Sequence, residues 1–182
     1  MNDDPPVSHI SLLQRREIEA KIVGPLIRAF GAEFGEARTL EILRSVITQL
    51  ARASGAELAE SLNSDALDSF AQTLDRWKEG GALELEILEQ SPERLSFNVT
   101  RCRYAELYRA LGMSELGASL SCQRDYALAE GFNPSIKLIR NQTIMQGAPY
   151  CDFRFRLETA DDIPRKTPEE PPASRDEEGK VD

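Results

Sequence analysis

A cysteine and an aspartate in the second half of the chain have the types and spacing for thiol and proton-transfer chemistry. Cys122 and Asp125 are three residues apart, so a helix would place both side chains on one face. A thiol attacks carbon only as its thiolate, and a neighbouring carboxylate in a dry pocket can accept the proton. The carboxylate also opposes the thiolate by charge repulsion, which Arg124 or another cation would have to offset. The spacing also fits a buried cysteine beside a solvated aspartate.

Cys151 is the second candidate thiol, and it opens a segment in which apolar and polar residues alternate. Alternation places Cys151 on one face of a strand with Phe153 and Phe155, and Asp152 on the opposite face. The pattern alone predicts a cysteine in the core. A pocket between a sheet and a helix would be lined by the same inward face, so Cys151 can still lie near Cys122.

Arg101 is the predicted anchor for a substrate carboxylate. It continues the alternating face of Leu95, Phe97 and Val99, which we expect to be buried. A guanidinium at the end of a buried face needs an anionic partner. That partner is either a ligand carboxylate or an acidic side chain of the protein, and the sequence fits both. Cys102, the third cysteine, is expected to pack.

Asn141, Thr143 and His9 are further candidates for contact with a substrate. Asn141 and Thr143 belong to a polar run, residues 141–147, between two segments that we expect to be extended. This run is either a ligand-orienting loop or an ordinary connection. His9 is the only histidine. No other side chain has an unperturbed pKa near neutrality, so a carboxylate must act as general base if His9 does not reach the site.

The cysteines do not form a recognisable metal motif. The chain has no Cys-x-x-Cys pair and a single histidine, although three cysteines and an aspartate would be enough ligands for tetrahedral zinc. Because their spacing matches no structural zinc motif, we predict a site without a metal or another cofactor. The odd number and wide spacing of the cysteines also argue against a disulfide framework.

These candidate residues require elements that position them, and helices are predicted to come first. Apolar residues recur at helical spacing over residues 11–30 and form one face. The members of that face are Ile18, Ile22, Leu26 and Phe30. A second helix, over 36–53, is predicted to bury Leu40, Leu43, Ile47, Leu50 and Ala51. A third helix is predicted over 64–78.

From residue 83 the apolar period changes from that of a helix to that of a strand. Residues 83–87 and 95–100 alternate on either side of a turn, which predicts a β-hairpin. Two more helices are expected at about 103–111 and 115–130, and extended segments at 135–139 and 150–157. The predicted fold class is therefore α+β, in which N-terminal helices pack with a small, mostly antiparallel sheet and further helices.

The pattern predicts one α+β catalytic domain over residues 9–158. Its helical part is 9–79, and its mixed part, 80–158, carries the site. Residues 1–8 are expected to be a flexible lead-in. Residues 159–182 contain four prolines, eight acidic and four basic residues, and this composition predicts a disordered tail.

Composition limits the classes of partner. The chain of 182 residues has a formal net charge of −9, so it should repel a phosphate backbone, and no nucleic-acid partner is expected. No apolar run approaches the ~20 residues of a membrane helix. The acidic N-terminus lacks the features of a signal peptide. We therefore expect a cytoplasmic protein that takes a small-molecule substrate, has no membrane partner and is able to form a homo-oligomer.

Several motifs, in order, resemble the L-2-amino-thiazoline-4-carboxylic acid hydrolase family. They are RCRYAELY at 101–108, LSCQRD at 120–125, EGFNP at 130–134, QTIMQG at 142–147 and CDFR at 151–154. The segment from His9 through 15–20 is also similar to that family. The resemblance covers about residues 9–157 and implies a hydrolase that opens a cyclic isothiourea or amidine ring. Water would be added at the carbon between the ring nitrogen and sulfur to give N-carbamoyl-cysteine.

The hypothesis for this reaction assigns a role to each candidate residue. Either Cys122 attacks the amidine carbon or Asp125 activates a water to do so, and Asp125 then relays the proton to the leaving sulfur. Cys151 lines the pocket. Arg101 holds the substrate carboxylate, and Thr143 or Asn141 binds the exocyclic nitrogen.

Two other functions fit the same sequence. One is a small-molecule binding module without turnover, because a closed pocket in an α+β domain serves either purpose. The other is a thiol-based protein that handles a metal or an organometal, since Cys-x-x-Asp with a distant second cysteine is also similar to the arrangement in organomercurial lyases.

Overall fold

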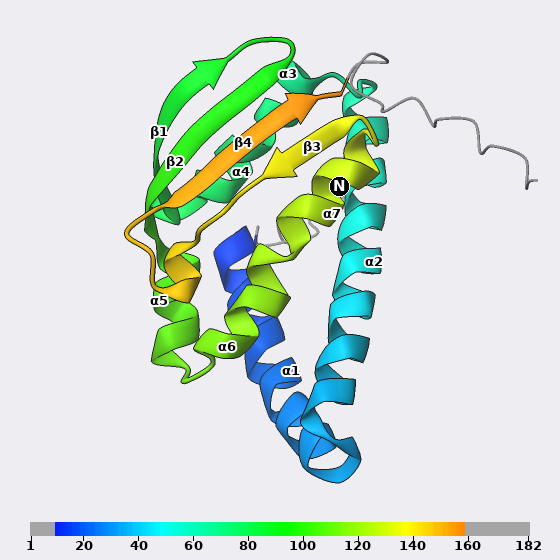
Figure 1. The fold of residues 1–182 in the computed structure, drawn as a ribbon, viewed down its shortest axis with the longest axis vertical. Coiled ribbons are helices and arrows are strands. Elements are labelled where there is room, and N and C mark those ends of the chain that lie inside the picture. The colour runs from blue at the N-terminus through cyan, green and yellow to red at the C-terminus, as the bar shows by residue number, and fades with distance from the viewer. Residues whose placement is uncertain (1–9, 159–182) are drawn as a thin grey trace, which may run out of the picture.

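The computed structural model describes residues 10–158, and Figure 1 shows a sheet packed against a layer of helices. His9, the predicted lead-in 1–8 and the tail 159–182 lie outside the described residues. Within 10–158 the predicted α+β class is confirmed. The assignment of this region to one catalytic domain stays a prediction.

Two long helices, α1 (Leu12–Phe34) and α2 (Glu36–Leu62), form an antiparallel hairpin (Figure 1). Ser11 caps α1 through a capping box: its hydroxyl accepts from the Gln14 amide, and the Gln14 side chain accepts from the Ser11 amide. Both helices extend beyond the predicted ends near 30 and 53. Gly55 lies inside α2, beyond the predicted end, and the backbone of a neighbouring helix passes directly over it.

That neighbour is α7 (Arg124–Phe132), and the two helices touch at glycines. A Cβ atom on Gly55 would overlap the carbonyl oxygen of Leu128, and one on Gly131 would overlap that of Arg52. Only glycine allows backbones to approach this closely. The contact fixes the position of α7, which carries Asp125.

The segment before α7 departs from the single helix predicted over 115–130. It consists of α6 (Ser114–Gly117) and a π-helical turn, η2 (Ala118–Cys122). Single π turns inside helical segments occur often at functional sites. Here the turn ends at Cys122 and directly precedes the helix with Asp125. Helix α5 (Arg103–Ala110) lies before it in the chain.

The sheet has four strands in the order β1-β2-β4-β3, and every neighbouring pair is antiparallel. The strands are β1 (Leu83–Gln90), β2 (Arg94–Cys102), β3 (Ile136–Ile139) and β4 (Cys151–Leu157). The predicted hairpin, β1–β2, is confirmed. A short 3-10 turn, η3 (Ile144–Gln146), connects β3 to β4.

One face of the sheet carries the core. Register pairs Leu95 with Phe155, Phe97 with Phe153 and Val99 with Cys151, so the inward side chains of β2 and β4 are neighbours. The rings of Phe97 and Phe153 stack with centroids 4.8 Å apart. Helices α3 (Leu67–Ala71) and α4 (Thr73–Lys78) cover this face with Phe70 and Trp77. They replace the single helix predicted over 64–78.

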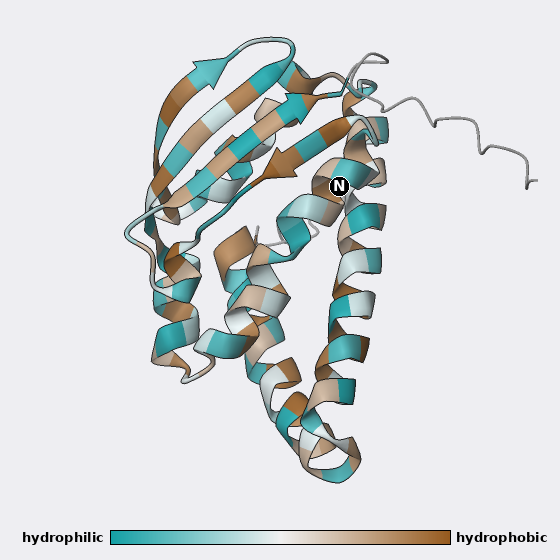
Figure 2. Cartoon of the chain, viewed as in Figure 1, coloured by the Kyte–Doolittle hydropathy of each residue, from teal (hydrophilic) through white to brown (hydrophobic). Residues whose placement is uncertain are grey.

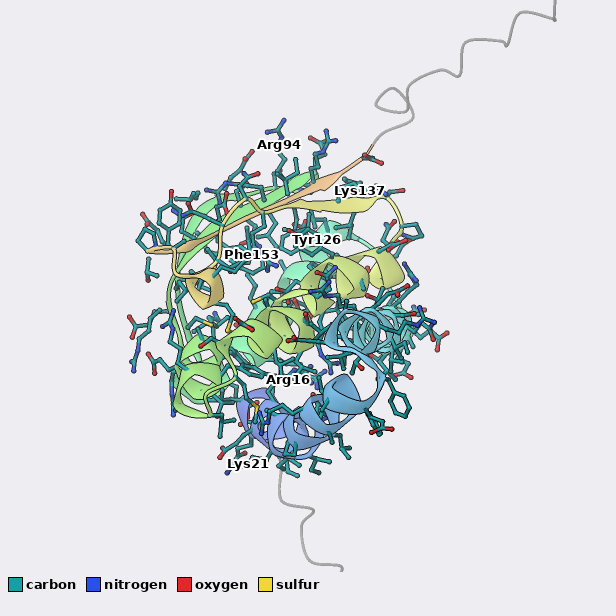
Figure 3. All side chains as sticks on the ribbon, turned by 60° about the horizontal axis from the view of Figure 1, so that its bottom comes forward. Arg16, Lys21, Arg94, Tyr126, Lys137 and Phe153 are labelled. Carbon is teal, nitrogen blue, oxygen red and sulfur yellow. The ribbon has the colours of Figure 1, made fainter. Side chains whose placement is uncertain are left out.

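Figure 3 views the layers from another side. Phe153 and Tyr126 lie between the sheet and α7, and Arg94 and Lys137 lie at the outer face of the sheet. In the region 10–158, no helix is both long and apolar enough to cross a membrane.

Candidate active site

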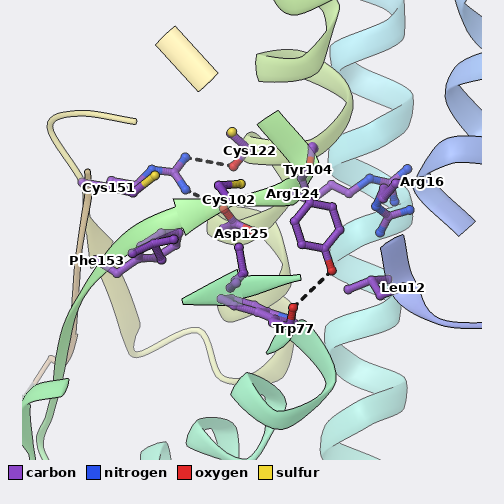
Figure 4. Close-up of a pocket in the computed structure, with 14 residues that line it drawn as sticks. Leu12, Arg16, Trp77, Cys102, Tyr104, Cys122, Arg124, Asp125, Cys151 and Phe153 are labelled. Carbon is purple, nitrogen blue, oxygen red and sulfur yellow. Dashed lines mark hydrogen bonds and ion pairs between the residues drawn. The ribbon is translucent and has the colours of Figure 1, made fainter. Parts of the chain in front are cut away.

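All three cysteines line one small cavity of about 80 Å³ between the sheet and the helices. Cys102 ends β2, Cys122 ends the π turn and Cys151 begins β4, and Asp125 lies in the first turn of α7 (Figure 4). Cys151 is only 6% exposed and faces inward, as its alternation predicted. The structure therefore brings the three predicted catalytic side chains together with Cys102, which was expected only to pack.

Asp125 is held by Arg140, which follows β3. Nη1 of Arg140 donates to Oδ2 of Asp125 at 2.5 Å, and Nη2 donates to the Cys122 carbonyl oxygen at 2.9 Å. The Arg140 side chain is 4% exposed. Its guanidinium carbon lies 5.0 Å from the ring centre of Tyr126 and 4.8 Å from that of Phe153. Arg140 therefore joins the start of α7 to the inner face of the sheet.

The ionisation of Asp125 depends on two opposing effects. Burial raises its pKa above the usual value, and the charge and hydrogen bond of Arg140 act to lower it. Among the described residues, no donor contacts the other carboxylate oxygen, Oδ1. A carboxylate with a raised pKa and a free oxygen is a stronger proton acceptor than a solvated one.

The three thiols are held in the neutral form. Burial raises the pKa of Cys102 to about 11, although the Ala105 amide donates to its sulfur and opposes the shift. Burial and then the charge of Asp125 raise the pKa of Cys122 further. Burial also raises the pKa of Cys151, whose sulfur accepts from the Ile144 amide at 3.2 Å. A thiolate is therefore disfavoured at neutral pH in this pocket.

A second group of charges lies at the wall formed by α1 and α7. Arg16 and Arg124 line the cavity with side chains 11% and 15% exposed. Both contact Glu19, at 2.5 Å from Nη1 of Arg16 and 3.1 Å from Nη2 of Arg124. Burial, and then repulsion by Arg16, lower the pKa of Arg124. Within residues 10–158, three arginines thus line the cavity and contact two acids, Asp125 and Glu19, which leaves one positive charge in excess.

Arg101 is not on the buried face, so that prediction is wrong. In the pairing of β1 with β2, Glu84 is opposite Arg101 and Leu85 is opposite Val99, which leaves Thr100 as an extra residue. This bulge reverses the alternation, so Arg101 points to solvent and Cys102 points to the cavity. Arg101 is 51% exposed and pairs with Glu106 at 2.9 Å and Glu84 at 3.3 Å. The acidic partner is therefore supplied by the protein.

Asn141 and Thr143 line a neighbouring polar cavity that shares Cys122 and Arg140 with the first. In the described part of the chain, both side chains donate hydrogen bonds to other protein groups. The Asn141 side chain donates to Asp152 at 3.1 Å, and the Thr143 hydroxyl donates to the Gln146 side chain at 2.9 Å. Partial burial acts to raise the pKa of Asp152, but the amide groups of Gln142 and Asn141 donate to its carboxylate, and their combined effect lowers the pKa. These contacts hold the loop that follows Arg140.

Sequence reasoning missed Arg16, Arg140 and the aromatic walls formed by Trp77 and Tyr104. Arg16 had a detectable signal, because it lies four residues after Leu12 and four before the buried Ala20, on the inward face of α1. Arg140 had no such signal in the sequence, because it follows the last residue of a short strand and so belongs to no periodic pattern. Over residues 10–158, no group of three or more histidine, cysteine or acidic side chains is arranged to hold a metal ion.

Comparison with known proteins agrees with the motifs. The family model of L-2-amino-thiazoline-4-carboxylic acid hydrolase matches residues 15–155. No curated protein matches the sequence. A crystal structure of the phenol-responsive sensory domain of the transcription activator PoxR with phenol has a TM-score of 0.50. It is 15% identical, and the match covers 74% of this chain and 72% of that chain, which shows a similar fold.

Alkylation should reveal that the thiols are neutral. Because the pKa of Cys102 is raised to about 11, its reaction with iodoacetamide should be about 100-fold slower at pH 8 than that of an ordinary cysteine. The rate should continue to rise up to about pH 11. Peptide mapping after timed alkylation measures each cysteine, and urea-unfolded protein is the control. A cysteine whose rate is already maximal below pH 8 would contradict this account.

Proposed function

The chain belongs to the L-2-amino-thiazoline-4-carboxylic acid hydrolase family, and we propose that it opens a small cyclic isothiourea or amidine ring by adding water. With 2-amino-thiazoline-4-carboxylate, the oxygen of water bonds to the carbon between nitrogen and sulfur. The bond from that carbon to sulfur breaks, and the sulfur takes a proton. The product is N-carbamoyl-cysteine, and no oxidant or reductant is needed.

The proposal rests on the carboxylate of Asp125 beside Cys122 in a largely apolar cavity whose lining residues, except Leu12, lie in the matched region. One oxygen of Asp125, which lines the cavity, is bound by Arg140, and the other has no donor among the described residues. This arrangement supports proton transfer, because a general base must be oriented and must have a free lone pair.

We propose that Asp125 acts first as base and then as acid. Its Oδ1 takes a proton from water as the water oxygen attacks the amidine carbon, which gives a tetrahedral intermediate. The protonated Asp125 then gives that proton to the sulfur as the carbon–sulfur bond breaks. The second proton of the water passes from the new hydroxyl to the ring nitrogen as the carbonyl forms. The positive charge of Arg140 stabilises the carboxylate before attack and after proton return.

The alternative route, attack by the Cys122 thiolate, receives less support. Burial and the Asp125 charge raise the pKa of Cys122, so forming a thiolate beside an ionised Asp125 is unfavourable. In our proposal, Cys122 and Cys151 are neutral walls of the cavity. A soft, polarizable thiol packs well against a sulfur-containing ring.

We propose Arg16 and Arg124 as the anchor for the ring carboxylate, in place of Arg101. Among the described residues Glu19 is the one acid that both contact, so the pair has an excess positive charge inside a protein whose net charge is −9. A carboxylate bound there would satisfy guanidinium groups that are already largely buried. Trp77 and Tyr104 line the intervening wall and offer flat surfaces to a ring.

A second candidate function is binding without turnover. It is favoured by the likeness in fold to the sensory domain of PoxR, which was solved with phenol. A small cavity with aromatic walls suits a compact ring whether or not the ring is opened. Under this alternative, a cyclic ligand would raise the melting temperature of the protein and be recovered unchanged.

Turnover should depend on the Asp125 carboxylate. Wild-type protein incubated with 2-amino-thiazoline-4-carboxylate should release N-carbamoyl-cysteine, and Asp125→Asn should lower kcat by about 100-fold or more because the amide cannot take a proton. Mass spectrometry quantifies the product. Asp75→Asn is the matched control, since that aspartate is 82% exposed on α4 and should leave the rate unchanged.

Three outcomes separate the alternatives. Full activity of Asp125→Asn would exclude the proton relay. Loss of activity in Cys122→Ala alone, with Asp125→Asn active, would favour the thiol route. Substrate recovered intact from a wild-type protein that it stabilises against heat would favour the binding module.

Replacement of the proposed anchor should affect substrate binding more than chemistry. Arg16→Gln should raise KM by about ten-fold or more, because a charge-assisted hydrogen bond to the carboxylate is lost, with a smaller change in kcat. Arg101→Gln is the matched control: this arginine is exposed and paired with Glu106, so KM should not change. A raised KM in Arg101→Gln with a normal KM in Arg16→Gln would contradict this proposal and support Arg101, the anchor predicted from the sequence.

A further inference from the structure

Helix α1 carries a continuous row of apolar side chains that the rest of the described chain does not cover. The row consists of Ile18, Ile22, Leu26, Phe30 and Phe34. Each residue follows the last by four, so all five lie on one side of the helix. Their exposed fractions range from 48% at Leu26 to 68% at Phe34. Figure 2 shows hydrophobic segments recurring along α1 and α2.

Helix α2 continues the same surface. Ile42, Val46 and Leu50 also follow one another by four and are 46–53% exposed. They line one apolar groove together with Leu26, Phe30 and Phe34 of α1. We call these eight side chains on the two helices the hairpin face. The buried Leu43 and Ile47 of α2 line the same groove beneath this exposed set.

The hairpin face is larger than a solvent-exposed surface normally allows. Eight large apolar side chains, each about half exposed, present on the order of 800 Å² of apolar surface, whereas the largest patch on a typical monomer is about 300–600 Å². A stable interface buries about 800 Å² on each partner. The face is therefore large enough to hold a partner by itself.

The remaining segments of this chain do not offer a cover. In residues 1–9 and 159–182, the larger apolar side chains are Met1, Val7, Ile163 and Val181. They are scattered among prolines and charged residues and have no helical repeat that matches the rows at 18–34 and 42–50. Segments 1–9 and 159–182 thus supply no matching cover, which favours a second molecule.

The charges around the hairpin face fit a second copy of the same chain. Lys21 pairs with Glu17 at 2.6 Å, and Arg38 pairs with Glu41 at 2.7 Å. The rim is therefore balanced in sign within one molecule, although the whole chain carries −9. Two identical faces brought together would therefore not place an excess of like charge against itself. A face that bound a strongly basic or acidic partner would instead carry an excess of the opposite charge.

We propose that the α1–α2 hairpin is a homodimer interface, in which two hairpin faces pack across a two-fold axis. Such an interface is self-complementary, so the same residues meet from both sides. Glu19 and Arg124, which bound one end of the groove, also belong to the charge group at the cavity. Dimerisation would cover that side of Arg124 and brace α1, which carries Arg16. The proposal does not rest on the proposed function.

A pair of matched leucine variants tests the interface. Leu26 on the hairpin face is 48% exposed, and Leu88 on β1, outside the face, is 49% exposed. By sedimentation velocity of the full chain, the wild type should have about twice the monomer mass of 20.3 kDa. Leu26→Glu should shift the protein to monomer at the same concentration, because each dimer would bury two carboxylates in apolar contact. Leu88→Glu should remain a dimer.

Circular dichroism and thermal melting of both variants test whether a monomeric species is folded. A wild type that is monomeric up to about 100 µM, or a dimer whose mass Leu26→Glu leaves unchanged, would overturn the proposal. A monomer that instead sediments with phosphatidylcholine vesicles would also overturn it and would assign the hairpin face to a lipid surface.

Discussion

The site depends on one buried ion pair, Arg140 with Asp125. A guanidinium that is 4% exposed is costly to bury unless its charge and its N–H groups find partners. Here the carboxylate and the Cys122 carbonyl oxygen accept from its two Nη groups, and the faces of Tyr126 and Phe153 lie against it. Its Nε–H has no partner among the described residues. The contacting groups come from the π turn, α7 and β4, so the pair fixes the end of β3 against the elements that carry the three candidate catalytic side chains. Loss of one partner would leave an uncompensated charge and cost about 3–5 kcal/mol.

The electrostatics of the cavity follow from the same pair. Arg140 allows a carboxylate to exist beside three cavity-lining sulfurs, and burial together with this carboxylate raises the pKa of Cys122 and keeps it in its thiol form. The site is therefore better suited to move a proton than to supply a thiolate. Arg16 and Arg124 on the opposite wall add the positive charge that a substrate carboxylate would need. Apolar walls of Trp77 and Phe153 reduce solvent screening between these groups.

Sequence patterns identified the elements and much of the site, and their failures have physical causes. Spacing of three placed Cys122 and Asp125 together, and alternation placed Cys151 inward, because helix and strand periods determine which side chains share a face. Alternation failed at Arg101, since the bulge at Thr100 inserts one residue that no pattern in β2 reveals. Periodicity also predicted Leu50 to be buried, but it is 53% exposed. A periodic row shows that a face is apolar and does not show what covers it.

Direct titration of Asp125 tests most sharply whether the ion pair maintains a proton acceptor in the cavity. Carboxyl carbons of aspartate labelled with carbon-13 report ionisation by NMR, and the resonance missing in Asp125→Asn identifies this residue. Asp125 should titrate above the usual value of about 3.9, because the effect of burial on its pKa outweighs that of Arg140. In Arg140→Gln the pKa should rise further, since the stabilising cation is lost. An Asp125 that titrates at or below the usual value, or that is unaffected by Arg140→Gln, would contradict it.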